Sequence, residues 1–353
     1  MSLEILDIAR DVLLGTIVAS AVLGVGLLLM RGSRGWRDRR TESRRDGARQ
    51  VLMSLMMGEP DEVETARATI SSATRRERAD LRAEAFQLLT KVRGEAADEL
   101  RRMLLADTAS EDALALTRSR SAVRRCRGIH RLGLLRRAED LPVMVRLLDD
   151  KVFDVRRMAV RALGSLGHAD AASPLVRRAG QARLRRDLLV ALSRLGTPAA
   201  PALRHELQNG LTRSSGPGRA AELSAHALGL LGDVESVGLL VTGLRSGEVR
   251  LMVRCANALG DIGAPGSVAD LAALLGHEDR EARTAAATAL GRIGAPEAVP
   301  ALAATFDDGD RVLNRAVATA LLRIGDAGRQ ALASCPSPYA REALAVSEVR
   351  GIA

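Results

Sequence analysis

The chain has 353 residues, a net charge of +9, 47% hydrophobic residues and only 1% aromatic residues. An apolar core of Ala, Leu and Val with so few aromatic side chains suits closely packed helices and excludes a β-rich fold. The three cysteines, Cys126, Cys255 and Cys335, are too few and too widely spaced for a disulfide framework or a zinc site, which fits a reducing compartment.

The first predicted element is a transmembrane helix over residues 12–30, after a short N-terminal segment over residues 1–11. Residues 12–30 carry no charge, and at 1.5 Å per residue they span about 28 Å, close to the thickness of a bilayer core. An Arg-rich juxtamembrane linker follows over residues 31–49. Because basic flanks stay in the cytoplasm, we predict a single-pass protein of the inner cell membrane with its N-terminus outside.

Two alternatives bear on this segment. Ala19-Ser20-Ala21 resembles a signal-peptide cleavage site, although the leading segment is acidic where signal peptides are basic. Within the uncleaved helix, Thr16, Ser20 and Gly24 fall at i, i+4 and i+8, a stripe of small residues that allows a second transmembrane helix to approach closely. Small residues are also common in such helices without any partner.

Residues 50–117 have a helical pattern and are predicted to form two diverged helical pairs that cap the N-terminal end of the following repeats. Residues 334–353 are predicted to cap the other end. Between them, over residues 118–333, a phrase of the form Leu-Gly-x-Leu/Ile-Gly recurs about every 31 residues. Its first leucines are Leu132, Leu163, Leu192, Leu228, Leu259, Leu290 and Leu321.

Each recurrence predicts one helix, a tight turn and a second helix. Alanine precedes the marker leucine in six of the seven phrases, which indicates a helix face that packs closely against a neighbour. The closing glycine suits a left-handed helix C-cap. A proline in the first turn of a second helix follows several phrases, at Pro142, Pro174, Pro201 and Pro300. Such pairs bury their apolar faces only by stacking, so the fold class is an all-α solenoid.

The phrases Ala-Leu-Gly-Ser-Leu-Gly at 162–167 and Ala-Leu-Gly-Arg-Ile-Gly-Ala-Pro-Glu-Ala-Val-Pro-Ala-Leu at 289–302 resemble HEAT-like repeats of the phycobilisome-lyase type. The resemblance covers about residues 118–333. It implies an α-solenoid of helical hairpins, a scaffold or adaptor function, and second helices that line the concave surface.

The positive charge is concentrated in the first repeats. Residues 118–219 contain 22 basic and 8 acidic residues, a net +14, whereas residues 220–353 have a net charge of −4. Part of this excess is expected to be structural, because an arginine recurs seven residues before the marker leucine at Arg125, Arg156 and Arg185 and can pair with nearby acids. The remainder predicts a basic binding face.

We therefore predict a membrane-anchored scaffold that binds another protein, such as an integral membrane enzyme or transporter, through a basic concave surface. Anionic lipid headgroups are the second candidate partner. Nucleic acid is disfavoured because Phe153 is the only aromatic residue in the basic region. The candidate contact residues are Arg124, Arg127, Arg136, Arg137, Arg146, Arg177, Arg178 and Arg204.

The alternative function is enzymatic. The pairs His205-Glu206 and His277-Glu278 suggest the di-iron site of deoxyhypusine hydroxylase, but they lie thirteen residues after and before their phrases and are not equivalent. A bilin lyase is the other enzymatic relative, and the sequence singles out no nucleophile or acid pair for it. We accordingly assign no catalytic residue, no metal ligand and no cofactor from the sequence.

Overall fold

The computed structural model describes residues 45–213, 216–306 and 310–349, and these residues form helices, turns and loops without a β-strand. The all-α prediction is confirmed for this part of the chain. No helix within these ranges is both long and apolar enough to cross a membrane. The predicted transmembrane helix over residues 12–30, with Thr16, Ser20 and Gly24, lies outside the described residues.

The chain divides into two compact units, residues 1–110 and residues 111–353. The described part of unit 1 contains a helix over residues 45–57 followed by α2, α3 and α4. A capping box starts α3, because the Thr74 side chain and the Glu77 side chain each bond the other residue's backbone N–H. The helices of unit 1 are α2 (Pro60–Ser72), α3 (Arg75–Leu88) and α4 (Glu95–Ala106).

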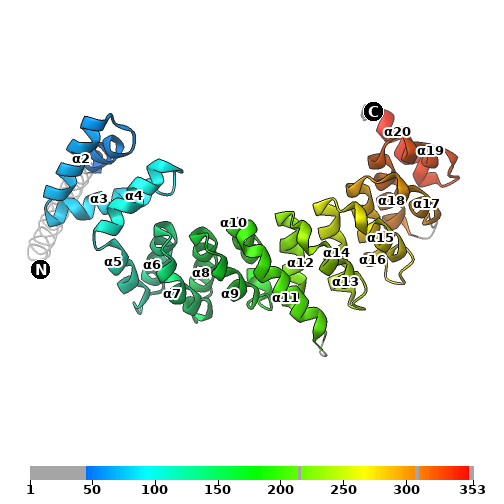
Figure 1. Cartoon of the computed structure of the whole chain (residues 1–353), viewed down its shortest axis with the longest axis horizontal. Coiled ribbons are helices and arrows are strands. Elements are labelled where there is room, and N and C mark those ends of the chain that lie inside the picture. Colours follow the sequence, from blue (N-terminus) through cyan, green and yellow to red (C-terminus); the bar gives the residue numbers. More distant parts are fainter. Residues whose placement is uncertain (1–44, 214–215, 307–309, 350–353) are drawn as a thin grey trace, which may run out of the picture. The chain divides into compact units, whose positions relative to one another are not determined.

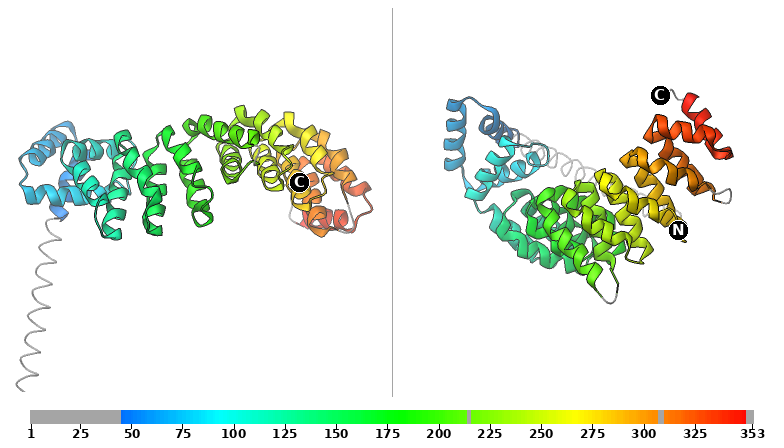
Figure 2. Two further views of the ribbon diagram at one scale, coloured as in Figure 1. Left: turned by 90° about the horizontal axis from the view of Figure 1, so that it is seen from below. Right: turned by 45° about the vertical axis from the view of Figure 1, so that its right-hand side comes forward.

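Unit 2 is a row of stacked helical pairs (Figures 1 and 2). The helix α5 (Ala109–Thr117) precedes the row, and α20 (Pro338–Val349) closes it by packing on the last pair. The first helices of the pairs are α6 (Ala122–Leu135), α8 (Phe153–Leu166), α10 (Arg185–Leu195), α12 (Arg219–Leu231), α14 (Val249–Ile262), α16 (Arg280–Ile293) and α18 (Arg311–Ile324). The second helices are α7 (Leu141–Arg146), α9 (Ala172–Val176), α11 (Ala200–Thr212), α13 (Val237–Leu244), α15 (Val268–Leu274), α17 (Val299–Ala304) and α19 (Asp326–Ser334).

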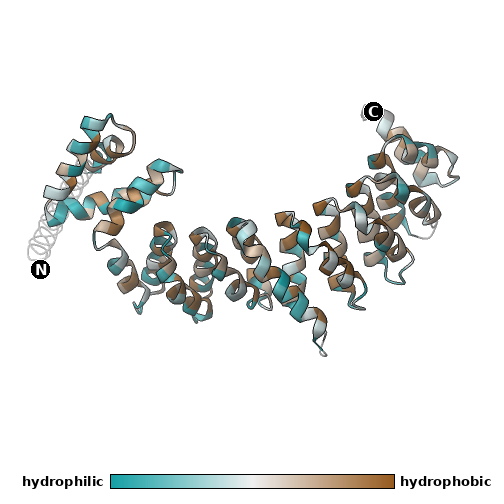
Figure 3. Ribbon diagram, viewed as in Figure 1, coloured by the Kyte–Doolittle hydropathy of each residue, from teal (hydrophilic) through white to brown (hydrophobic). Residues whose placement is uncertain are grey.

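Most turns of the pairs follow the sequence prediction, but Gly196 and Gly325 have a positive φ without the predicted left-handed α conformation. Gly167, Gly232, Gly263 and Gly294 end their first helices with a left-handed backbone, which glycine adopts without a steric penalty. The first pair differs, because Arg136 holds this position with a φ of 57°. The marker leucines are buried at the centre of a continuous apolar core. Figure 3 shows both hydrophilic and hydrophobic residues along the helices, as expected for helices that are buried on one side.

Successive first helices pack against each other far more extensively than successive second helices do. A stack of helical pairs curves toward the side on which successive helices lie closest to each other. In Figure 1, α6, α8, α10 and α14 accordingly lie on the inner side of the bend of unit 2, and α7, α9, α11 and α13 lie on the outer side. The expectation that second helices line the concave surface is therefore wrong for this chain.

Glycine and alanine together cause this close approach. The glycine after the marker leucine faces the alanine before the marker leucine of the next pair. A methyl group added to Gly164 would lie 2.6 Å from the Cα atom of Ala191, and one added to Gly291 would lie 2.5 Å from that of Ala320. Equivalent contacts join α6 to α8, α12 to α14 and α14 to α16.

The tight row is interrupted between α10 and α12. Ser193 replaces the glycine on α10 and is exposed, and α12 packs mainly on α11 instead of α10. The extra residues of this repeat lengthen α11 to Thr212. Residues 209–212 are therefore helical.

We predict that Gly229→Ala destabilises unit 2, because the new methyl group would lie 2.6 Å from the Cα atom and 2.8 Å from the Cβ atom of Ala258. Displacement of helix backbone on both sides should cost about 1–3 kcal/mol. Urea unfolding followed by circular dichroism measures this loss. The matched control is Gly238→Ala in the same pair, where nothing lies within 4 Å of the added methyl group, and stability should rise slightly, by about 0.5 kcal/mol. Equal stability of the two variants would contradict the close-approach argument.

Candidate functional site

The arginine that recurs seven residues before the marker leucine has a structural role. The Nη1 group of Arg125 donates to the carbonyl oxygens of Ser119 and Arg120 at 3.0 and 2.9 Å. The Nη1 groups of Arg156 and Arg283 make the same pair of contacts, each to the residues six and five positions earlier. Each guanidinium thus closes the loop that leads into its own first helix.

In the first pair this arginine also reaches the next repeat. The Nε and Nη2 groups of Arg125 donate to Asp150 at 2.8 and 2.9 Å, and both side chains are only 9% exposed. The hydrogen bond to Asp150 raises the pKa of Arg125. Partial burial raises the pKa of Asp150, but hydrogen bonds from Arg125 and the Val152 amide outweigh it and hold that pKa below its ordinary value.

The eight sequence-predicted contact residues fall on both rows of helices. Arg124 and Arg127 are exposed on α6, whereas Arg136 and Arg137 follow the end of that helix, where Arg137 lies 3.3 Å from Glu139. Arg146 is exposed at the end of α7. The structure therefore does not bring all eight together on one face.

The remaining three candidates lie on the outer row. Arg177 is exposed at the end of α9, but its neighbour Arg178 forms an ion pair with Asp149 of the preceding pair. Arg204 on α11 pairs with Glu235 and lies 3.6 Å from Asp233 of the following pair. Arg178 and Arg204 thus join adjacent repeats, which removes them from the set available to a partner.

A set of six arginines on the first helices is exposed or half-exposed. We call this set the first-helix basic face, and it comprises Arg124 and Arg127 on α6, Arg157 and Arg161 on α8, and Arg186 and Arg194 on α10. Asp154 lies 3.2 Å from Arg157, and Asp187 lies 2.8 Å from Arg161. The other four arginines have no carboxylate partner among the described residues.

Four arginines of the first-helix basic face were not among the sequence-predicted contact residues: Arg157, Arg161, Arg186 and Arg194. Arg157 and Arg186 are both six residues before their marker leucine, and Arg157 is half-exposed and Arg186 is exposed. The predicted binding face on second helices does not include this position. The positive charge of residues 118–219 was correctly recognised, but the row that presents it was not.

The only aromatic side chain of the basic region lies against guanidinium groups. The guanidinium of Arg183 lies 4.5 Å from the ring centroid of Phe153, and those of Arg156 and Arg157 lie 5.6 and 5.9 Å from it. Such cation–π contacts join the start of α8 to the turn before α10. The half-exposed ring therefore already has guanidinium neighbours.

Among the described residues, no group of three or more His, Cys, Asp or Glu side chains is arranged to hold a metal ion. His205 is exposed and His277 accepts a hydrogen bond from the Asp279 backbone at 3.0 Å. Burial raises the pKa of the Cys255 thiol above its ordinary range, as expected for a core cysteine.

A row of helical pairs with a charged inner face is the architecture of solenoid proteins that act through an extended surface. Family comparison agrees with this class. The chain belongs to the HEAT-repeat family, whose model matches residues 110–193, 239–323 and 270–347, more than half of the sequence. The unmatched residues 194–238 contain the interruption between α10 and α12. No curated protein sequence matches the chain significantly.

Solved structures are similar to this chain, and one of them, with a TM-score above 0.5, supports the same fold. The karyopherin Kap121p bound to the extreme C-terminus of the protein phosphatase Cdc14p aligns with a TM-score of 0.55 at 13% identity, over 87% of this chain and 40% of its own. The CpcE–CpcF complex of phycocyanin lyase from Nostoc sp. PCC7120 has 23% identity over 68% of this chain and 94% of its own, with a TM-score of 0.33. Human deoxyhypusine hydroxylase has 21% identity over 80% and 97%, with a TM-score of 0.32.

We predict that Asp150→Asn destabilises the folded chain by about 2 kcal/mol at pH 7, because it removes a charge-assisted hydrogen-bonded pair with Arg125. The folded-state pKa of Asp150 is lowered, so its contribution is complete above the ordinary pKa of an aspartate and is lost as the pH falls through the lowered value. Urea unfolding should therefore show a difference between wild type and variant that is constant above about pH 5 and shrinks below about pH 4.

The matched control is Asp154→Asn, which removes an exposed pair with Arg157 and should change stability by less than about 0.5 kcal/mol. A difference between wild type and Asp150→Asn that grows as the pH falls would contradict this account of the Arg125–Asp150 pair.

Proposed function

We propose that the chain is a membrane-anchored scaffold that binds a partner protein through the first-helix basic face at the cytoplasmic side of the inner membrane. The observation that carries the proposal is a set of four arginines on α6 and α10 that have no carboxylate partner in the described part of the chain: Arg124, Arg127, Arg186 and Arg194. Unpaired charges add little to the stability of this fold, whereas they steer and orient an oppositely charged partner.

The spacing of the face indicates what kind of partner fits. Packed helix axes lie about 8–10 Å apart, so the helices α6, α8 and α10 that carry these arginines repeat at roughly that distance across the row. A partner helix with acidic residues seven positions apart presents carboxylates about 10 Å apart. An acidic helix laid across these three helices therefore matches the face in both charge and period.

The similarity to a known complex supports the general proposal that the chain binds another protein. Kap121p, which shares the fold, is bound in its structure to a segment of another protein. For the present chain, the anchor over residues 12–30 would hold the face near the bilayer, and Thr16, Ser20 and Gly24 would offer a second contact to an integral membrane partner such as an enzyme or transporter.

Charge reversal tests the face. We expect the double variants Arg124→Glu with Arg127→Glu, and Arg186→Glu with Arg194→Glu, each to lower the yield of partner crosslinked in intact membranes about tenfold. The matched control is Arg250→Glu with Arg280→Glu, two exposed arginines on the first helices α14 and α16, and it should capture normally.

Two outcomes would redirect the proposal. Normal capture by both inner-row variants, with loss in Arg146→Glu plus Arg177→Glu, would place the partner on the outer row of helices. Capture that occurs only in bilayers with anionic lipid, and fails in phosphatidylcholine alone, would favour the lipid surface over a protein as the partner.

Sidedness is tested separately by proteolysis. We expect protease added outside sealed spheroplasts to leave residues 31–353 intact, and protease added to inverted inner-membrane vesicles to remove them. Mass spectrometry of the retained fragments measures both results. Digestion of the repeat region from outside would overturn the proposed topology and the cytoplasmic partner with it.

A further inference from the structure

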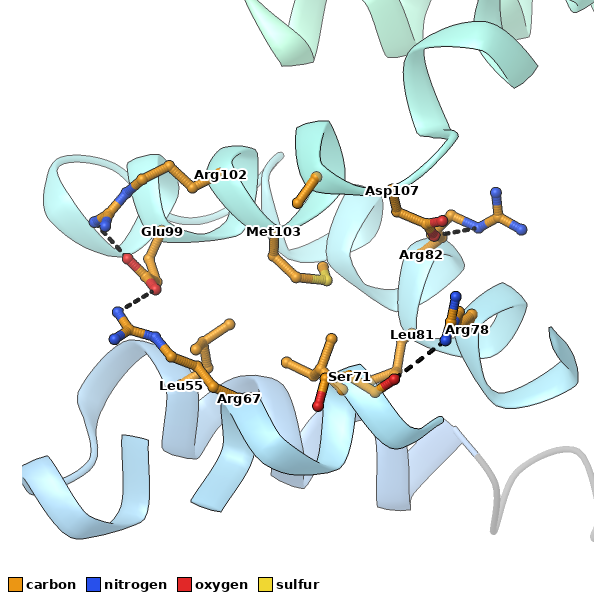
Figure 4. Close-up of a pocket in the computed structure, with 12 residues that line it drawn as sticks. Leu55, Arg67, Ser71, Arg78, Leu81, Arg82, Glu99, Arg102, Met103 and Asp107 are labelled. Atoms are coloured by element: carbon orange, nitrogen blue, oxygen red, sulfur yellow. Dashed lines mark hydrogen bonds and ion pairs between the residues drawn. The ribbon is translucent and has the colours of Figure 1, made fainter. Parts of the chain in front are cut away.

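Unit 1 contains a cleft whose lining includes no residue of the first-helix basic face. It has a volume of about 600 Å³, within the range of small-molecule sites, and it opens between α2 and α4 (Figure 4). Its lining residues come from the helix over residues 45–57, α2, α3 and the α4 region. The apolar ones are Leu55, Ile70, Leu81, Met103 and Ala106.

The cleft exists because α2 and α4 do not pack closely on each other. Of its thirteen residues α2 buries only Ala66, and its Ile70 is half-exposed toward the gap. Met103 of α4 is also half-exposed and reaches into the gap from the other side (Figure 4). Leu55 and Leu81 are 4% and 5% exposed. The apolar walls can therefore accept an apolar group that removes more of their surface from water.

One end of the cleft is bounded by a shared carboxylate. The Nη2 group of Arg67 on α2 donates to the Oε1 atom of Glu99 on α4 at 2.9 Å, and Arg102 forms an ion pair with the same Glu99 (Figure 4). Arg67 and Arg102 are 59% and 68% exposed. Two guanidinium groups thus share one carboxylate at this end, and both remain accessible to a second anion.

The other end also has more guanidinium groups than carboxylates. Arg82 lies 3.3 Å from Asp107. Arg78 donates to two backbone carbonyl oxygens, those of Ser71 at 3.1 Å and Ala73 at 3.0 Å, and not to a carboxylate. Four arginines and two acids therefore line a cleft whose walls are apolar.

We propose that this cleft binds an amphiphile with one apolar chain and an anionic head group. The chain lies against Ile70, Leu81 and Met103, and the carboxylate or phosphate of the head group is held by Arg67 and Arg102. A neutral head group would leave the excess positive charge unmatched, and a cationic one would be repelled. Guanidinium groups bind carboxylate and phosphate with the same donor geometry, so a free fatty acid and an anionic phospholipid are the two sources of this ligand.

Photolabelling tests the site on the full-length chain in phosphatidylcholine nanodiscs. Palmitate with a diazirine on its chain is added, the sample is irradiated, and labelled peptides are identified by mass spectrometry. We expect labelling of α2 and α4, reduced about tenfold by Met103→Glu and by Ile70→Glu on the opposite wall. The matched control is Leu105→Glu, because Leu105 is 40% exposed on α4 but does not line the cleft.

Head-group chemistry is tested by two further probes. Hexadecanol with the same diazirine should label the cleft about tenfold less than palmitate does, and diazirine-bearing phosphatidylglycerol in the disc shows whether a membrane lipid serves as the source. Labelling outside α2 and α4, or labelling that survives both wall variants, would overturn the site. Equal labelling by the alcohol would overturn the anionic head group. A chain that fails to co-purify with nanodiscs would refute the anchor and not the cleft.

Discussion

The close approach of successive first helices is the constraint on which the rest of unit 2 depends. A glycine on one helix leaves room for the backbone of the next, and only alanine fits opposite it, as at Gly164 and Ala191. This pairing draws the first helices together into the inner row of the stack and leaves the second helices farther apart. It also explains the composition, because a seam of Gly and Ala has no space for aromatic side chains.

The basic face ends where the close approach of first helices is interrupted. Ser193 replaces the glycine of the phrase, and the stack continues through the contact between α11 and α12. The family model leaves residues 194–238 unmatched at this point, and the net charge changes from positive before it to negative after it. Two tightly stacked groups of pairs therefore meet at α11, and the arginines of the first-helix basic face all belong to the earlier group.

The sequence predicted the fold well because its signal is local and periodic. The marker leucines indicate the first helix of each unit, the C-cap glycines its end, and prolines such as Pro142 the start of the second helix. Repetition makes this assignment unambiguous. The candidate site was predicted less well because the partners of its arginines lie one repeat away. Arg178 and Arg204 looked available in sequence, yet their carboxylate partners are 29 and 31 residues distant. The cleft in unit 1 has no sequence signal, since it results from two helices that do not meet.

The contacts of each arginine show whether its guanidinium group holds the fold together or remains exposed. At Arg125 one guanidinium donates to two carbonyl oxygens through Nη1 and to both oxygens of Asp150 through Nε and Nη2. The single ammonium of a lysine cannot reproduce this planar set of donors. An arginine is therefore required seven residues before the marker leucine wherever it ties a loop to the next repeat. No such requirement applies to Arg124 or Arg194, which are exposed on first helices, so the loop contact that holds Arg125 in place does not account for their charge.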